Sequence, residues 1–449
     1  MKLIPDSSTV KRALSAHAAI GLIAGALLYI VSLSGTVAVF FEEWQRIEQP
    51  RAPEMPAINP QALQRGIIAV LAKEAGQPPT THLYAHLPVA ALPRTTITTD
   101  HQALHIDARG DISGKEEIAW SDFVVQLHYL LNIPGMVGIT IVGILGVMML
   151  TLALSGVIAH PRIFRDAFRL RARDQNGLGL ADWHNRLSVW TLPFTVGIAL
   201  TGAVIGLGSV MAFGLAKTNY GGKQEAVFAP IFGPEGKPDK TAAPPPDVPA
   251  ALAYMAAHHP GLRLTYVTVH DPLTRGQHIQ ILGTPPRRLI FGEYYNFDGQ
   301  GRFLGTAGLS DGALGQQAAA SNYDLHFGNF GGLPVKIAYA ILGLALTAIC
   351  ATGTYIWLGK RRRRGLEEPR LRSVWDAVVW GSPLMLTATF LLRKLAGNDA
   401  PLATTYWLGS VALILAGIVL SRPGRLAMLL TRTLGASLLI AAGLAIWRP

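Results

Sequence analysis

Long uncharged stretches dominate this chain, and several are long enough to cross a membrane. A helix needs roughly 20 residues to span a hydrocarbon core of about 30 Å. Four stretches meet this length clearly, and three weaker ones follow towards the C-terminus, the last with Arg432 near its start. A long side chain there can reach the interface. The pattern predicts seven spans: 18–41, within 129–159, within 187–216, 337–358, 377–392, 404–420 and about 426–447.

The basic residues predict how the spans are oriented. Short loops rich in Lys and Arg stay in the cytoplasm. Two loops fit this rule: residues 160–186, with six arginines, and residues 360–372, with four consecutive arginines. The long connections 42–126 and 217–323 are then expected in the periplasm of a Gram-negative cell. The first apolar run has 24 residues, more than the hydrophobic part of a signal peptide, and predicts a retained anchor with a cytoplasmic N-terminus.

Composition narrows the class of protein further. Charged residues make up 15% of the chain and hydrophobic residues 50%, whereas soluble chains have about 25% charged residues. The net charge of +11 comes from basic residues beside the spans, which indicates contact with membrane lipid and not with nucleic acid. A single cysteine, Cys350, excludes internal disulfides, zinc fingers, four-cysteine iron-sulfur clusters and covalent haem attachment. Any haem would have to be held by histidine.

Both long connections predict folded domains of mixed secondary structure. In the first, Asn59 and Pro60 are typical of a helix start, and we expect a helix over 62–75. The second has a helix-like segment at 249–258, and an exposed loop rich in Pro and Gly is expected at 230–249. The expected strands are 95–99, 104–107, 264–269 and 279–282.

The first four spans and the two outer segments form two copies of one unit. His17 precedes Gly35 by 18 residues, and His184 precedes Gly202 by the same 18. Each glycine directly follows a serine or a threonine. This shared spacing pairs His17 with His184.

A second spacing repeats in the same order. A Leu-His pair follows each outer segment; 28 residues separate His128 from Gly156, and 27 separate His326 from Gly353. This repeat pairs His128 with His326. Since 18 helical residues rise about 27 Å, the two histidine pairs are expected at opposite membrane faces. Gly35 and Gly202 are then level with His128 and His326, and Gly156 and Gly353 with His17 and His184.

These histidines are the candidate cofactor ligands. Histidines at span ends often only occupy the interface, but a symmetric set at two depths favours ligands. Imidazole binds haem iron, zinc and copper; a zinc site would favour carboxylate or thiolate company, so two haem b groups are the expected cofactors. Glycine lets a flat macrocycle approach the backbone. The pattern predicts a four-helix bundle that holds two stacked haems.

Other histidines and the cysteine receive different interpretations. His160 lies four residues after Gly156 without a counterpart in the second copy. It could replace His17 or His184 as a ligand, or contact a haem propionate. Cys350 is expected to be a small core residue. Six histidines of the outer segments are expected on solvated surface: His82, His86, His101, His105, His258 and His259.

The combined motifs resemble the PepSY-associated transmembrane helix family over about residues 8–372. The first copy contributes a span beginning with His17, an Asp-x-x-Gly turn at 107–110, Leu127-His128 and Ser155-Gly156. The second contributes Asp182-Trp183-His184, a turn at 298–301 and Leu325-His326-Phe327-Gly328. The chain departs from relatives at Ala18 and Asn185, where a basic residue usually follows the histidine, and in its three C-terminal spans.

The resemblance implies a function. Members are often called iron-regulated membrane proteins, and characterised relatives are inner-membrane di-haem reductases of ferric siderophores such as ferrioxamine. His17, His128, His184 and His326 match the family's recurrent histidines. By this resemblance the chain is expected to be a haem-dependent ferric-siderophore reductase, an oxidoreductase of the inner membrane.

The electron donor and the side chains near the substrate follow from the loops. Because the inner loops are too short for a flavin or nicotinamide domain, electrons are expected from membrane quinol or from a separate reductase. No catalytic side chain is expected beyond the cofactor ligands. Surface charges that would draw an anionic chelate towards the outer haem are Arg94, Arg263, Arg287 and Arg288.

Two other functions remain open at this point. One is a non-enzymatic regulator whose PepSY domains restrain a periplasmic peptidase, a role attributed to soluble relatives. The other is a transporter, since repeats also build carriers, although this repeat is parallel and no charged residue lies in the middle of a span.

The expected fold is mainly α: a duplicated four-helix transmembrane core, two periplasmic α+β PepSY-like domains and about three extra C-terminal helices. The expected boundaries are 1–41 for the N-terminus and first span, 42–127 for the first outer domain, 128–160 for the second span, 161–186 for a cytoplasmic loop, 187–216 for the third span, 217–325 for the second outer domain, 326–359 for the fourth span, 360–376 for a basic loop and 377–449 for the last three spans.

Overall fold

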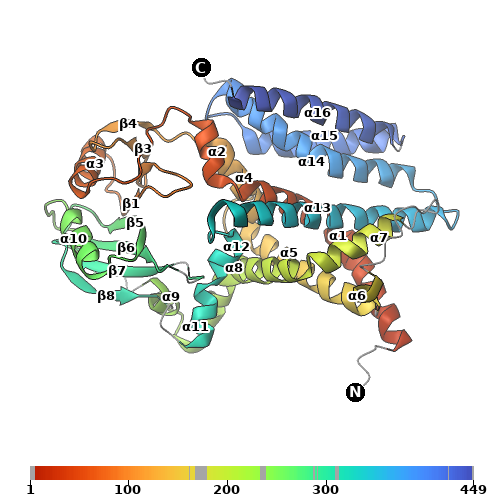
Figure 1. Cartoon of the computed structure of the whole chain (residues 1–449), viewed down its shortest axis with the longest axis horizontal. Helices are drawn as coiled ribbons and strands as arrows, with labels where there is room; N and C mark the ends of the chain where they lie inside the picture. Colours follow the sequence, from red (N-terminus) through yellow and green to blue (C-terminus); the bar gives the residue numbers. More distant parts are fainter. Residues whose placement is uncertain are drawn as a thin grey trace. The chain divides into compact units, whose positions relative to one another are not determined.

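The computed structural model describes residues 6–160, 162–166, 179–232, 239–286, 289–290, 292–308, 313–422 and 424–446. The chain is a multi-pass membrane protein: within these residues seven helices are long and apolar enough to cross a membrane. They confirm the seven predicted spans, although residue 447 lies outside the described part. The seven helices, labelled in Figure 1, are α1 (Ser7–Ala38), α5 (Met136–Ala159), α8 (Leu192–Asn219), α13 (Gly332–Arg362), α14 (Pro369–Ala396), α15 (Leu402–Leu420) and α16 (Arg425–Ile446).

The chain divides into two compact units. The helical unit consists of Met1–Phe41, Ile118–Leu207 and His326–Pro449. The sheet unit consists of Glu42–Glu117 and Gly208–Leu325. The sheet unit is therefore built from the two long connections that the hydrophobic pattern set apart.

Helix α1 has the most neighbours in the first four spans. It packs against α5, α13 and the short helix α4 (Ala119–Leu130). A Cβ on Gly343 of α13 would lie 2.5 Å from the Thr36 hydroxyl of α1. Small residues let helices approach closely in lipid, where packing drives their association. The small residue at this crossing therefore fixes how closely α1 and α13 pack.

Three of the four paired histidines lie on short helices that precede the spans. His128 is on α4, His184 on α7 (Gly179–Trp190) and His326 on α12 (Asn322–Phe327). The predicted ranges 128–160 and 326–359 are therefore not single helices. Left-handed backbone ends the short helices: Leu131 follows α4 with φ 54°, and Gly328 follows α12 with φ 68°.

The three C-terminal helices belong to the helical unit. The Tyr29 hydroxyl of α1 donates to the Val379 carbonyl at 2.7 Å. The Trp375 indole donates to the Ala351 carbonyl of α13 at 2.9 Å, and the Tyr355 hydroxyl donates to the Asp376 carboxylate at 2.8 Å. Buried polar groups are costly without such partners. These bonds therefore bind α14 to both α1 and α13.

The sheet unit contains one antiparallel sheet of eight strands. Within the described residues each sequence copy contributes four strands and one helix that packs on them, and the strand order is β4-β3-β2-β1-β5-β6-β7-β8. The first copy supplies α3 (Pro60–Lys73), β1 (His82–His86), β2 (Thr95–Thr98), β3 (Ala103–Ile106) and β4 (Ile112–Lys115). The second supplies α10 (Val248–His258), β5 (Arg263–His270), β6 (His278–Thr284), β7 (Glu293–Asp298) and β8 (Phe303–Ala307).

This continuous sheet corrects the expectation of two separate outer domains. Strand β1 of the first copy pairs directly with β5 of the second, with His82 opposite His270 and His86 opposite Tyr266. Unpaired strand edges invite association with other chains. The pairing removes one edge from each copy, and it joins their apolar residues into one core.

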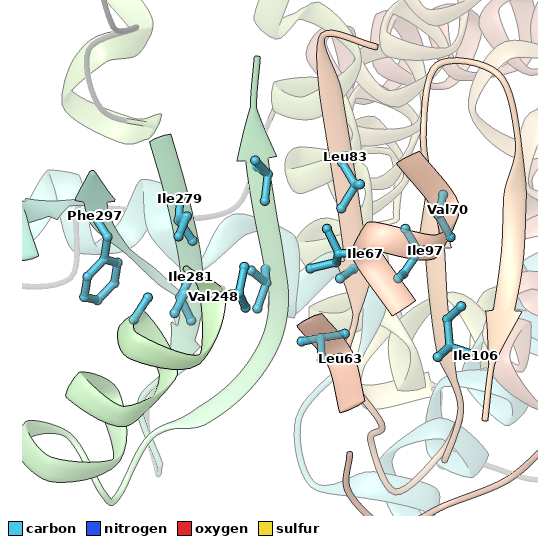
Figure 2. Packing of buried hydrophobic residues seen from close by; sticks show 14 of the residues in the cluster. Leu63, Ile67, Val70, Leu83, Ile97, Ile106, Val248, Ile279, Ile281 and Phe297 are labelled. Carbon is cyan, nitrogen blue, oxygen red and sulfur yellow. The ribbon is translucent and has the colours of Figure 1, made fainter. Parts of the chain in front are cut away.

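Figure 2 shows this core on one face of the sheet. Residues of α3 such as Leu63 and Ile67 pack on Leu83 and Ile97, and Val248 of α10 lies beside Ile281. The Asp-x-x-Gly turns bring each hairpin against its own helix. Gly110 (φ 92°) and Gly301 (φ 73°) have left-handed backbone, and a Cβ on either would overlap the start of α3 or α10.

The predicted helices and strands of the outer segments are confirmed. Asn59 caps α3 through its side chain, which accepts from the Gln61 N–H. The expected loop at 230–249 is wrong at its start, because α9 includes residues 230–232, and 233–238 lie outside the described residues. The remaining short helices were not predicted: α2 (Phe41–Glu48), α6 (Ile163–Asp166), α9 (Glu225–Phe232) and α11 (Leu314–Ala320).

Candidate functional site

The structure brings His17 of α1 and His184 of α7 together. Their ring centroids are 6.5 Å apart, and the ring planes are at 90°. Both side chains are half-buried. We call these two residues the His17 pair.

His128 of α4 and His326 of α12 form the second pair. Their ring centroids are 5.9 Å apart and the planes are at 28°. Both side chains are half-buried. We call these two residues the His128 pair. The structure thus places side by side the residues that the duplication paired.

The separation within each pair suits two imidazoles that share one metal ion. An imidazole nitrogen binds a metal at about 2.0 Å, and the ring centroid lies about 1 Å behind that nitrogen, so two rings on opposite sides of an ion have centroids about 6 Å apart. In the described part of the chain no group of three or more His, Cys, Asp or Glu side chains is arranged to hold a metal. An ion at either pair would therefore have two protein ligands.

Hydrogen bonds determine which ring nitrogen is available in the first copy. His17 Nδ1 lies 3.1 Å from the Leu152 carbonyl, and His128 Nδ1 lies 2.9 Å from the Val31 carbonyl. A carbonyl only accepts, so Nδ1 carries the proton. Nε2 then keeps its lone pair, which a metal can bind.

The second copy reaches the same tautomer through threonine. His184 Nδ1 lies 2.9 Å from Thr352 Oγ1, and His326 Nδ1 lies 3.0 Å from Thr201 Oγ1. Each hydroxyl also lies 2.7 Å from a carbonyl one turn earlier in its own helix. Because a hydroxyl has one hydrogen, which goes to that carbonyl, it accepts from the imidazole N–H.

Each of the four glycines faces a histidine of another helix. An added Cβ would lie 2.6 Å from His128 Cε1 at Gly35 and 2.9 Å from His326 Cε1 at Gly202. The corresponding distances are 3.3 Å to His17 at Gly156 and 3.6 Å to His184 at Gly353. The sequence suggested that glycine makes room for a macrocycle. In the structure the absent side chain makes room for the imidazole itself.

His160 lies at the C-terminal end of α5 and is exposed. It is close enough to His17 and His184 to interact with both electrostatically. The ring contact is nevertheless between His17 and His184, which makes His160 a neighbour of the His17 pair.

The family comparison covers all of these residues. The family described as "PepSY-associated TM region" matches residues 14–360 of this chain. The chain belongs to this family. The uncharacterized protein PA4219 of Pseudomonas aeruginosa is 28% identical to it over 309 residues, which cover 66% of this chain and 77% of that protein. The family prediction is confirmed, and helices α14, α15 and α16 lie beyond the matched residues.

In this PepSY-associated chain the histidines of the sheet unit belong to neither pair. Burial lowers the pKa of His86 and of His105 to about 4. His105 is 4% exposed, with its two ring nitrogens at Thr96 and Gln49, so its expected surface position is wrong. His270 and His278 stack at 4.2 Å with planes 2° apart. At 4.2 Å these stacked rings are closer than the about 6 Å that separates two imidazoles on opposite sides of one ion.

The candidate steering arginines differ in their surroundings. Arg94 is 3% exposed and contacts the Glu54 carboxylate at 3.0 Å, so its expected role as a surface charge is wrong. Arg263 is exposed at the start of β5. Arg287 and Arg288 lie outside the described residues.

The sequence did not identify the groups that orient the histidines. These are the carbonyls of Val31 and Leu152 and the hydroxyls of Ser155, Thr201 and Thr352. A signal was present, because a serine or threonine precedes all four glycines.

Proposed function

We propose that this PepSY-associated protein is an inner-membrane, haem-dependent electron conduit that reduces ferric siderophores at the periplasmic face. The observation that carries the proposal is the pair of two-histidine sites, with centroids 6.5 and 5.9 Å apart. All four rings have Nδ1 engaged and Nε2 available.

The residues fit haem b better than a bare metal ion. In each pair the two imidazoles would hold the haem iron, and the absence of a third ligating side chain within the described residues suits an ion whose other ligands come from a macrocycle. Bound haem would supply a one-electron carrier at each pair. The protein would hold each imidazole in one orientation and tune its donor strength through the Nδ1 hydrogen bonds.

The positions of the pairs support transfer across the membrane. His17 lies early in α1, and Gly35, which faces His128, lies 18 residues later in the same helix. At about 1.5 Å per residue this is about 27 Å, close to the thickness of a hydrocarbon core. An electron would have to use both pairs in turn.

The orientation follows from the basic loops. With those loops in the cytoplasm, the His17 pair lies at the inner face, where quinol or a separate reductase would deliver electrons. The ferric chelate accepts one electron per iron at the other face and releases the more weakly held ferrous ion. Exposed Arg263 supports an anionic chelate as the substrate.

The test begins with cofactor content. We expect a pyridine haemochrome assay on the purified full chain to give about two non-covalent haems b per protein and a low-spin spectrum. In vesicles of known orientation, an Fe(II) trap should report reduction only when the siderophore is on the periplasmic side. A colourless protein would overturn the proposal. Haems that stay ferrous with excess ferric siderophore would show that they serve another acceptor.

A further inference from the structure

The two sequence copies orient their histidines with partly different groups. In the first copy, His128 Nδ1 has the Val31 carbonyl as its partner, whereas His17 Nδ1 lies 3.1 Å from the Leu152 carbonyl and 3.2 Å from the Ser155 hydroxyl. In the second, His184 and His326 have threonine hydroxyls as partners. Each pair therefore contains one ring, from the second copy, that a threonine hydroxyl supports.

A carbonyl cannot be removed by changing a side chain, whereas a threonine hydroxyl can. Thr201 lies on α8 and serves the His128 pair; Thr352 lies on α13 and serves the His17 pair. The carbonyls of Ile198 and Ile349, three residues before these threonines, are also hydrogen-bond partners of the two histidines. Loss of a threonine hydroxyl would thus remove one hydrogen-bond partner of the histidine ring and leave the isoleucine carbonyl as the other.

We infer that Thr201 and Thr352 are positioning residues that set the donor strength of His326 and His184, and with it the reduction potential at each pair separately. This inference rests on the proposed function. An acceptor on Nδ1–H makes an imidazole a stronger donor, and a stronger donor favours the ferric state. Removing the acceptor therefore raises the potential of the affected haem.

A purely structural role for these hydroxyls is the alternative. Threonines in membrane helices commonly bond to a carbonyl one turn earlier. Thr347 supplies the matched control: it is buried on α13, and its hydroxyl donates to the Gly343 carbonyl at 2.9 Å. Its structural bond is the same as that of Thr352, but it lies more than one helical turn from the Thr352-Gly353 pair that faces His184.

The experiment is an optical redox titration of the purified full chain. For Thr201→Val we expect one of two haem transitions to rise, with about a tenfold higher ferrous-to-ferric ratio at fixed potential, about 59 mV for one electron. Thr352→Val should move the other transition. Thr201→Ser, Thr352→Ser and Thr347→Val should titrate like the wild type. Two retained haems with unmoved transitions in both valine variants would overturn the inference.

A second measurement does not depend on haem. In haem-free protein, nitrogen NMR of labelled histidine reports the tautomer. Thr201→Val should increase the Nε2–H form of His326, and Thr347→Val should not. If the wild type contains no haem, the proposed function fails, while this tautomer shift still decides the role of threonine. An unchanged tautomer in both valine variants would refute that role.

Discussion

The His128 pair and the His17 pair share one motif but differ in how tightly they are packed. At the His128 pair, added Cβ atoms on the facing glycines would lie 2.6 and 2.9 Å from the rings. At the His17 pair the distances are 3.3 and 3.6 Å. Real side chains do not approach within about 3 Å without displacement, and well-packed interiors tolerate added atoms poorly. Two sites built from the same elements, a histidine and a facing glycine in each copy, therefore differ in how much added volume they tolerate.

The helices that carry the two pairs also differ. The His128 pair lies on two short helices that end in left-handed turns. The His17 pair has one ring on the long span α1 and has the exposed His160 beside it. The proposed haem at the tighter site should be lost more readily when the packing is altered.

The largest expected effect is the loss of a histidine that would hold a proposed haem. His128→Ala and His326→Ala should each remove about half of the total haem, and the double variant should lose no more, because residues that act as a unit are non-additive. His17→Ala and His184→Ala should remove the other half. Haem quantification with reduced spectra measures this. Additive haem losses within a pair would show that its two histidines do not hold the same haem.

The second effect separates the two sites by packing. Gly35→Ala should weaken haem retention about 10- to 100-fold, which corresponds to an overpacking cost of about 1–3 kcal/mol. Gly202→Ala should have a smaller effect, Gly156→Ala a slight one, and Gly353→Ala almost none. Haem transfer to apomyoglobin would measure the series. Equal haem loss from the Gly35→Ala and Gly353→Ala variants would show that the two sites tolerate added volume equally.

The third effect concerns the pH dependence of the stability of the sheet unit. Burial holds the pKa of His86, His105 and His270 at about 4, against 6.5 for an ordinary histidine. The unfolded chain then binds more protons between these values, so the stability of the sheet unit is full above about pH 6.5 and falls as the pH drops towards 4. Hydrogen-exchange protection factors of β1, β3 and β5, which are corrected for the intrinsic exchange rate at each pH, should fall over this range. Unchanged protection factors in these strands would contradict the assignment.

The smallest expected effect is that of His160→Ala. The ring contact of His17 is with His184, so this variant should keep both haems. Loss of the haem at the His17 pair in His160→Ala, with retention in His17→Ala, would mean that the two copies use different ligands. The spectra of both variants should be compared in one preparation.

The pairing of the histidines could be predicted from the sequence because a helix has a fixed rise per residue. Eighteen residues separate His17 from Gly35 on α1, and the same 18 separate His184 from Gly202, which is enough to pair the histidines from the sequence. The pairing of β1 with β5 had no such signal, because strands about 180 residues apart in the chain were joined. The short helix before α5 was missed because Leu131 and Asn132, which are not glycines, adopt left-handed backbone. Arg94 was misplaced because its partner Glu54 is recognisable only in three dimensions.

The hydrogen bond from Trp375 to Ala351 gives the C-terminal helices a mechanical role. Ala351 directly precedes Thr352, the partner of His184, so α13 orients His184 through Thr352 while the adjoining Ala351 carbonyl is hydrogen-bonded to α14. The family match ends at residue 360, before α14 begins. A displacement of α14 would therefore move the Ala351 carbonyl and, through the adjoining Thr352, His184 of the His17 pair. A chain truncated after residue 360 would lose the contact with α14 while keeping every histidine.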